Sequence, residues 1–204
     1  MGYFPFFVDI SGKKCLIAGG GRVALRKIER LLDYSPEITV VSPEICPEIA
    51  ELSGIRIIRR EFSDSDIDGA FMVIAATDDS ALNAHIYQLC NDRNIPVNSV
   101  DDKEHCSFIF PALVHRGDIT IGISTGGTSP LFAQFIRQTA EEWLDDYHLG
   151  IAKLLSAYRP VVRERFDTEK KRKEALNAIF DLCLTDDKLP DDEEIQQLLE
   201  AIDI

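Results

Sequence analysis

The stretch at residues 13–34, KKCLIAGGGRVALRKIERLLDY, predicts a strand, a glycine loop and a helix in direct succession. Its centre has the spacing G-x-G-x-x-A, with Gly19, Gly21 and Ala24 at the fixed positions. Such a loop places backbone N–H groups at the positive end of a helix, where a pyrophosphate can bind. Gly19 permits the tight turn, Gly21 lets the backbone approach the phosphates, and Ala24 allows close helix–strand packing. Because the glycines follow a strand and open a helix, we predict a dinucleotide site, with a plain strand–helix turn as the alternative.

The composition is that of a folded acidic protein. The 204 residues are 45% hydrophobic and 28% charged, which is typical of a globular chain. The formal net charge of −13 argues against broad nucleic-acid binding, since phosphate contacts need a basic face. No segment resembles a signal peptide or reaches transmembrane length, so we expect a cytoplasmic protein. The five cysteines are scattered without a C-x-x-C pair, which predicts neither a disulfide framework nor a zinc site.

Strand and helix patterns alternate through the first hundred residues. This alternation implies right-handed crossovers and a parallel sheet, so we predict an α/β fold with a Rossmann-like, doubly wound sheet. The run at 71–76 is continuously apolar, as expected for a strand covered on both faces. The predicted strands are 14–18, 38–42, 56–60, 71–75 and 96–100, and the predicted helices are 22–34, 44–52 and 79–93.

The alternation of strand and helix patterns ends near residue 112. We predict strands at 107–110 and 119–123, with a turn at Gly117 and Asp118 between them. A helix should begin at Pro130 with Ser129 as its N-cap. Further helices are predicted at 149–166, 169–184 and 191–201. We therefore expect three parts, at residues 1–112, 113–148 and 149–204.

Two further segments are candidates for cofactor contacts. Thr77 and Asp78 follow the fourth predicted strand, and ligands of doubly wound sheets bind outside the carboxyl ends of the strands. The alternative is that Asp78 or Asp79 only caps the next helix. After the second strand, the acid expected near the ribose is replaced by Ser42, with Pro43 and Glu44 following. The choice between NAD and NADP stays open, with NAD favoured.

An acidic cluster follows the fifth predicted strand. Asp101 would face the same crevice as the nicotinamide end of a cofactor, where a carboxylate can take a proton while hydride leaves. Asn98, in the strand itself, is a candidate substrate contact. The alternative is an ordinary turn, which spacing alone favours.

A second possible anion site lies in the loop before Pro130. Hydroxyls, two glycines and a helix N-terminus could bind substrate carboxylates, and an ordinary capped helix is the alternative. The histidines show no metal-ligand spacing, so no metal site is predicted. The candidate loop residues are Ser124, Thr125, Gly126, Gly127, Thr128 and Ser129.

Taken together, the motifs resemble those of the precorrin-2 dehydrogenase family, the module that in many siroheme synthases also acts as sirohydrochlorin ferrochelatase. The resemblance implies that NAD accepts hydride from precorrin-2 to give sirohydrochlorin, and that Fe²⁺ is then inserted to give siroheme. It implies that Asp101 serves both steps, that Arg22 and Val23 contact phosphate, and that Pro43 and Glu44 contact the cofactor beyond the second strand. The matching segments are 4–7, 15–27, 75–79, Asn83, 97–101, 106–112 and 123–130.

The resemblance also implies an architecture. A Rossmann domain at 1–112 would be followed by a dimerisation region at 113–148 and a helical domain at 149–204. The expected homodimer would line each active site with both chains. Arg116 and Arg137 could offset the carboxylates of the tetrapyrrole, together with Arg26 and Lys27, because local charge rather than net charge decides such binding. A non-catalytic NAD-sensing module is the alternative function, although such a sensor needs neither Asp101 nor the 124–130 loop.

Overall fold

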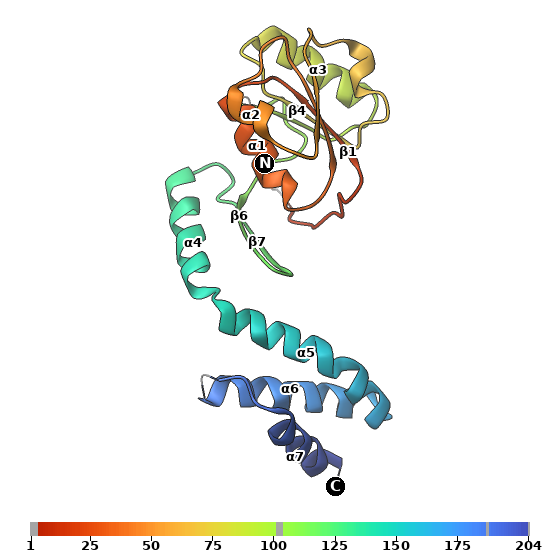
Figure 1. Ribbon diagram of the computed structural model, residues 1–204, viewed down its shortest axis with the longest axis vertical. Helices are drawn as coiled ribbons and strands as arrows, with labels where there is room; N and C mark the ends of the chain where they lie inside the picture. Colours follow the sequence, from red (N-terminus) through yellow and green to blue (C-terminus); the bar gives the residue numbers. More distant parts are fainter. Residues whose placement is uncertain (1–3, 101–103, 187, 204) are drawn as a thin grey trace. The chain divides into compact units, whose positions relative to one another are not determined.

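The chain folds into two compact units. The computed structural model describes residues 4–100, 104–186 and 188–203 (Figure 1). One unit is Phe4–Phe110 and the other begins at Pro111. The predicted division into three parts, with boundaries after residues 112 and 148, stays a prediction.

A five-stranded parallel sheet forms the centre of the first unit. Its order, β3-β2-β1-β4-β5, reverses direction between β1 and β4, which makes that pair the topological switch point. The predicted doubly wound, Rossmann-like sheet is confirmed. The strands are β1 Lys14–Ala18, β2 Glu37–Val41, β3 Ile55–Ile58, β4 Met72–Ala75 and β5 Val97–Ser99.

Helices cover both faces of this sheet (Figure 1). Because side chains alternate along a strand, Ile17 of β1 packs into one apolar cluster and Leu16 into another. The first cluster includes Ile28 and Ile49, and the second includes Ile86. The four helical segments are α1 Arg22–Leu32, α2 Pro47–Glu51, the 3₁₀ helix η1 Asp64–Ile67 and α3 Ser80–Asp92. Apart from η1, which the sequence patterns missed, they lie where helices were predicted.

The strand predicted at 107–110 is wrong. In the described part of the chain no strand forms at 107–110, and the preceding Cys106 makes an isolated bridge with Asn98 rather than a ladder. The Val97 N–H donates to Ser107 Oγ at 2.7 Å, and Asn98 Nδ2 donates to the Phe108 carbonyl at 3.0 Å. The Ser107 N–H donates to the Val97 carbonyl at 2.9 Å, but side chains bond the Val97 N–H and the Phe108 carbonyl, so the segment lies along β5 without forming a ladder.

The second unit begins with an antiparallel hairpin. Strands β6 Ala112–Arg116 and β7 Ile119–Ile123 pair with Arg116 opposite Ile119, which leaves Gly117 and Asp118 as the turn. The turn was predicted correctly, but β6 begins where no strand was expected. Gly117 has a φ of +56°, a conformation that glycine adopts readily.

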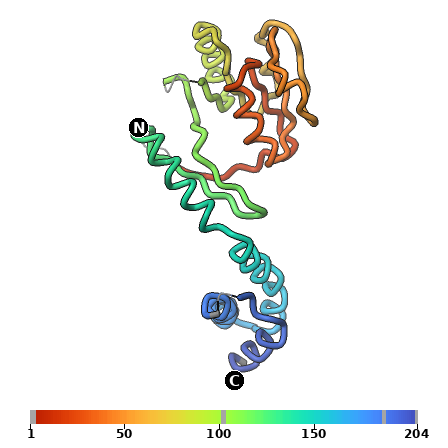
Figure 2. The backbone as a smooth tube through the Cα atoms, turned by 60° about the vertical axis from the view of Figure 1, so that its left-hand side comes forward, coloured from red at the N-terminus to blue at the C-terminus, as the bar shows by residue number. Residues whose placement is uncertain are grey.

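The remaining helices are α4 Pro130–Trp143, α5 Asp146–Arg165, α6 Glu169–Asp186 and α7 Asp192–Asp203. Helix α5 packs on α6 and α6 on α7 (Figure 2). Their shared apolar cluster includes Val162, Ile179 and Leu199. In the parts of the chain that are described, no helix combines the length and the apolar character needed to cross a bilayer.

Candidate functional site

The glycine loop packs tightly on two neighbouring segments. A Cβ at Gly19, whose φ is +120°, would lie 2.2 Å from the Ala76 carbonyl oxygen. A Cβ at Gly20 would lie 2.0 Å from the Glu44 carbonyl oxygen. These two glycines therefore allow the loops after β4 and β2 to approach the end of β1. The role of Gly20 was missed, because the G-x-G-x-x-A spacing treats that position as variable.

Gly21 stands in open space. No atom lies within 4 Å of where its Cβ would be, and its φ of −89° is available to any residue. Helix α1 begins directly after it without a side-chain cap. Its first intrahelical bond runs from the Leu25 N–H to the Gly21 carbonyl, so the N–H groups of residues 22–24 precede the helical ladder. Open space and unclaimed donors at a helix start fit the phosphates of a dinucleotide.

Two predicted cofactor segments adjoin this loop. Ala76, which contacts Gly19, directly precedes Thr77 and Asp78. On the other side, the Cys46 N–H donates to the Gly20 carbonyl at 2.8 Å, which holds the segment containing Glu44 against the glycines. The carboxyl ends of β1, β2 and β4 thus bring together Gly19, Gly21, Arg22, Val23, Ser42, Pro43, Glu44, Thr77 and Asp78.

Asn83 fixes the position of Thr77. The Thr77 hydroxyl donates to Asn83 Oδ1 at 2.7 Å, and Asn83 Nδ2 donates to the Thr77 carbonyl at 3.0 Å. Asp79 accepts the N–H groups of Ala81 and Leu82 and so caps α3. The capping alternative therefore holds for Asp79, whereas Asp78 is exposed. Asn83 is buried and polar, a combination that sequence alone does not reveal.

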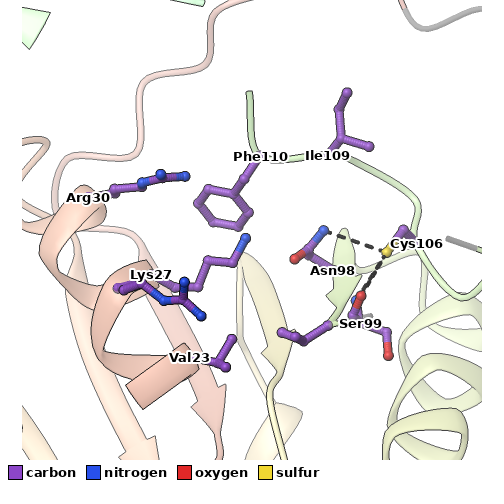
Figure 3. Close-up of a pocket in the computed structure, with 10 residues that line it drawn as sticks. Val23, Lys27, Arg30, Asn98, Ser99, Cys106, Ile109 and Phe110 are labelled. Carbon is purple, nitrogen blue, oxygen red and sulfur yellow. Dashed lines mark hydrogen bonds between the residues drawn. The ribbon is translucent and has the colours of Figure 1, made fainter. Parts of the chain in front are cut away.

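A pocket of about 560 Å³ lies between α1 and the end of β5 (Figure 3). Helix α1 contributes Val23, Arg26, Lys27 and Arg30. The end of β5 contributes Asn98, Ser99 and Val100, and the following segment contributes Cys106, Ile109 and Phe110. Asp101 lies outside the described residues, directly after Val100 in the sequence.

Asn98 organises one wall of this pocket. Its side-chain nitrogen donates to the Phe108 carbonyl at 3.0 Å and approaches Cys106 Sγ at 3.5 Å. Cys106 Sγ in turn lies 3.1 Å from the Ser99 carbonyl oxygen and 3.2 Å from the Ser99 nitrogen. Asn98, only 7% exposed, thus holds the segment at 106–110 against β5.

The loop at 124–129 belongs to the second unit and is internally hydrogen-bonded. Ser129 Oγ accepts the Phe132 N–H at 3.3 Å, which confirms the predicted N-cap of α4. The Thr125 hydroxyl donates to the Ser129 carbonyl, and the Thr128 hydroxyl donates to the Thr125 carbonyl. Ser124 Oγ accepts the Gly126 N–H. The loop is therefore ordered by its own hydroxyls, and its predicted contacts with substrate stay predictions.

The two arginines predicted to face substrate also have partners in this unit. Arg116 donates to the Leu144 carbonyl and pairs with Asp146 at 2.9 Å. Arg137 pairs with Glu141, one helical turn further along α4. Their role in substrate binding stays a prediction, and it would require an exchange of partners.

Metal-ligating side chains do not gather in the described residues, which contain no group of three or more His, Cys, Asp or Glu suited to a metal ion. Burial raises the pKa of the Cys15 thiol to about 11 and that of Cys90 to about 11. Both are therefore neutral thiols at physiological pH and poor ligands or nucleophiles.

Comparison with known proteins places the chain in a family. The family described as putative NAD(P)-binding matches residues 6–112, more than half of the 204 residues. The chain belongs to this NAD(P)-binding family. A second family, described as sirohaem biosynthesis protein central, matches residues 116–139. An NAD-type cofactor, predicted from the glycine loop, is thereby confirmed.

Relatives of this NAD(P)-binding chain include siroheme synthases. That of Thioalkalivibrio sulfidiphilus (strain HL-EbGR7) is 43% identical over 177 residues, which are 85% of this chain and 36% of the relative. That of Photorhabdus laumondii is 35% identical over 212 residues, which cover 100% of this chain and 45% of the relative. The chain thus spans less than half the length of these curated relatives.

Among solved structures, SirC, a precorrin-2 dehydrogenase, is similar with a TM-score of 0.76 and 25% identity. The similarity covers 98% of this chain and 99% of that one. The resemblance inferred from the sequence motifs is confirmed.

Proposed function

We propose that this chain is an NAD-dependent dehydrogenase that oxidises precorrin-2 to sirohydrochlorin in siroheme biosynthesis. One observation carries the proposal: the similarity to SirC, a precorrin-2 dehydrogenase, covers 98% of this chain and 99% of that protein. The siroheme synthase relatives are longer and support the pathway rather than the whole activity of this chain.

The residues at the carboxyl edge of the sheet would hold the cofactor. The N–H groups of Arg22 and Val23 would bind the pyrophosphate in the open space before Gly21. Ser42, Pro43 and Glu44 would face the adenosine ribose, and Thr77 and Asp78 would border the opposite side of the cofactor. When bound, NAD⁺ supplies a hydride acceptor.

Asp101 would act as the general base. Oxidation of precorrin-2 removes a hydride and a proton, and a carboxylate beside the crevice can accept that proton. The support for Asp101 is its place in the sequence, directly after the pocket-lining Val100, and its match to the motif of the family. The products are sirohydrochlorin, NADH and a proton.

Insertion of Fe²⁺ into sirohydrochlorin is the second proposed activity. Iron entry displaces the pyrrole N–H protons, and Asp101 would accept each in turn and release it to water as the metal binds the macrocycle. Iron would enter as substrate and leave in the product.

A homodimer would cover the apolar side of α4. Leu131 is 79% exposed, Phe132 54%, Phe135 59% and Trp143 60%. Exposed apolar patches of this kind mark interfaces. A second copy would also bring its own 124–129 loop, Arg116 and Arg137 toward the substrate side, as the family resemblance implies.

The decisive test combines the purified chain with precorrin-2 and NAD⁺, without and then with Fe²⁺. We expect NADH and sirohydrochlorin to form together, and siroheme to follow when iron is present. Asp101→Asn should bind NAD⁺ like wild type and lose dehydrogenase turnover. If the wild type binds NAD⁺ and leaves precorrin-2 unchanged, the NAD-sensing alternative replaces this proposal.

A further inference from the structure

We propose that Arg26, Lys27 and Arg30 form a carboxylate-binding surface, here named the α1 stripe, that orients the acidic tetrapyrrole in the pocket beside β5. This inference rests on the proposed function and names the residues that would recognise the acid groups of its substrate. Of the basic residues expected to offset the carboxylates, Arg116 and Arg137 pair with Asp146 and Glu141, whereas Arg26 and Lys27 line the pocket, where Arg30 joins them.

The helix places the three cations on one side. Arg26 and Arg30 are neighbours at i, i+4, Lys27 and Arg30 are neighbours at i, i+3, and all three line the same pocket. Their Cα atoms span on the order of 6 Å along the axis, at about 1.5 Å per residue. A flat macrocycle with acid groups around its rim can meet such a row with more than one carboxylate.

The three side chains line the same cavity. Lys27 Nζ lies 4.0 Å from the centre of the Phe110 ring, and a cation over an aromatic face is held there by electrostatic attraction. Figure 3 shows the amine of Lys27 directed across the pocket toward Phe110 and Asn98. The volume of about 560 Å³ is within the range of small-molecule sites.

The described residues that line this cavity carry positive charge, whereas the protein as a whole carries net negative charge. The chain has 35 acidic and 22 basic residues, yet none of the described residues that line the pocket is acidic. Elsewhere in the same unit, Arg60 pairs with Asp66 and Arg93 with Asp68. Within the described residues, neither Arg26 nor Arg30 makes an ion pair. A local excess of positive charge attracts an anionic ligand despite the net charge.

A buried hydroxyl in the same pocket supplies an independent observation. Ser99 is only 4% exposed, and its Oγ makes no hydrogen bond with the described part of the chain. A buried polar atom without a partner costs free energy, so a ligand that offered Ser99 a hydrogen bond would gain from it. Because Ser99 lines the same pocket as the α1 stripe, a polar substituent of the bound ligand would supply that partner.

The test measures affinity without requiring turnover. A stable octacarboxylate porphyrin serves as the probe, titrated by fluorescence at several salt concentrations against wild type, Arg26→Gln, Arg30→Gln and the triple glutamine variant. We expect each single variant to weaken probe binding about tenfold, because a charge-assisted hydrogen bond contributes about that factor. The triple variant should also show a weaker dependence on salt.

Matched controls separate charge from folding. Arg56→Gln removes the same charge from an exposed position on β3, outside the pocket, and should bind the probe like wild type. Arg26 and Arg30 are exposed and glutamine is a good helix former, so the variants should keep helix α1 folded. NAD⁺ affinity should therefore stay unchanged in all of them. Ser99→Ala should weaken probe binding without lowering stability.

The outcomes distinguish this inference from the proposed function. Wild-type probe affinity in Arg26→Gln, Arg30→Gln and the triple variant would overturn the α1 stripe, even if precorrin-2 is oxidised normally. Weakened probe binding in these variants would support the stripe, even if wild type failed to form NADH from precorrin-2 and the proposed function fell. With precorrin-2 itself, the stripe predicts that Arg30→Gln raises KM while kcat stays close to that of wild type.

Discussion

Two helix starts in this chain look alike in sequence and differ in structure. Helices α1 and α4 both follow a loop with glycines, and both were candidate anion sites. Helix α1 has no side-chain cap and has open space at Gly21. Helix α4 has Pro130 in its first turn and Ser129 Oγ on the Phe132 N–H. Proline has no N–H and Ser129 occupies another donor, so α4 offers fewer free groups to an anion.

The comparison teaches that the cap, more than the glycines, separates the two loops. Before α1, neighbouring backbone occupies the space where side chains of Gly19 and Gly20 would lie, whereas the space beside Gly21 is open. In α4 the hydroxyls of the loop turn inward to its own carbonyls. A ligand can approach the first helix start directly, whereas at the second it must compete with bonds already made.

Filling a packed glycine should have the largest effect. Gly20→Ala would place a methyl group 2.0 Å from the Glu44 carbonyl oxygen and 2.9 Å from Ile45 Cδ1. We expect the free energy of unfolding to fall by about 3 kcal/mol, because backbone must move. Urea denaturation measures this, with Gly21→Ala as the matched control. Equal stability of the two variants would contradict the packing described for Gly20.

Filling the open glycine should affect binding instead. Gly21→Ala meets no atom within 4 Å, so the free energy of unfolding should change by less than about 0.5 kcal/mol. The methyl group would stand where the pyrophosphate approaches the backbone, and the Kd for NAD⁺ should rise about tenfold. Calorimetric titration gives the Kd. Unchanged NAD⁺ affinity would contradict the proposal that the pyrophosphate binds at the start of α1.

Removing the cap of α4 should cost stability and leave the cofactor unaffected. Ser129→Ala deletes the acceptor for the Phe132 N–H, and we expect a loss of about 1 kcal/mol in the free energy of unfolding. Ser129→Asp keeps a cap and adds negative charge, so it should retain stability. If Ser129→Asp nevertheless raises the KM for precorrin-2, the α4 start binds substrate carboxylates after all.

The smallest expected effects are changes in the pH dependence of stability, one in acid from Asp66 and one in alkali from Tyr158. In the sheet unit, the hydrogen bond from Arg60 lowers the pKa of Asp66. This stabilisation is present above the ordinary carboxyl pKa and is lost as the pH falls through the lowered value. In the helical region, the hydrogen bond to Asp192 and partial burial raise the pKa of Tyr158 to about 12.

The Tyr158 contribution is complete below the ordinary tyrosine pKa near 10 and is lost as the pH rises through about 12. Tyr158→Phe should lower the free energy of unfolding by about 1 kcal/mol at neutral pH and remove this alkaline dependence. Asp66→Asn should remove the acid dependence instead. Denaturation at several pH values checks both, and an unaltered alkaline profile in Tyr158→Phe would contradict the assignment.

The sequence was informative where the signal is local. The glycine loop, the alternation of strands and helices, the Ser129 cap and the turn at Gly117 all depend on residues close together in the chain. Each was predicted correctly. The strand predicted at 107–110 was wrong because the Val97 N–H and the Phe108 carbonyl bond to the side chains of Ser107 and Asn98, and an apolar pattern does not reveal such partners.

Composition and spacing therefore determined the sheet, the cofactor class and the family resemblance, since glycine conformation and side-chain periodicity act over a few residues. Tertiary structure alone decided the purpose of Gly20, the buried Asn83 and Asn98, and the grouping of Arg26, Lys27 and Arg30 with Ser99 and Phe110. The physical reason is that a pocket is built from segments distant in the chain, and their contact depends on how the sheet packs rather than on any one stretch of residues.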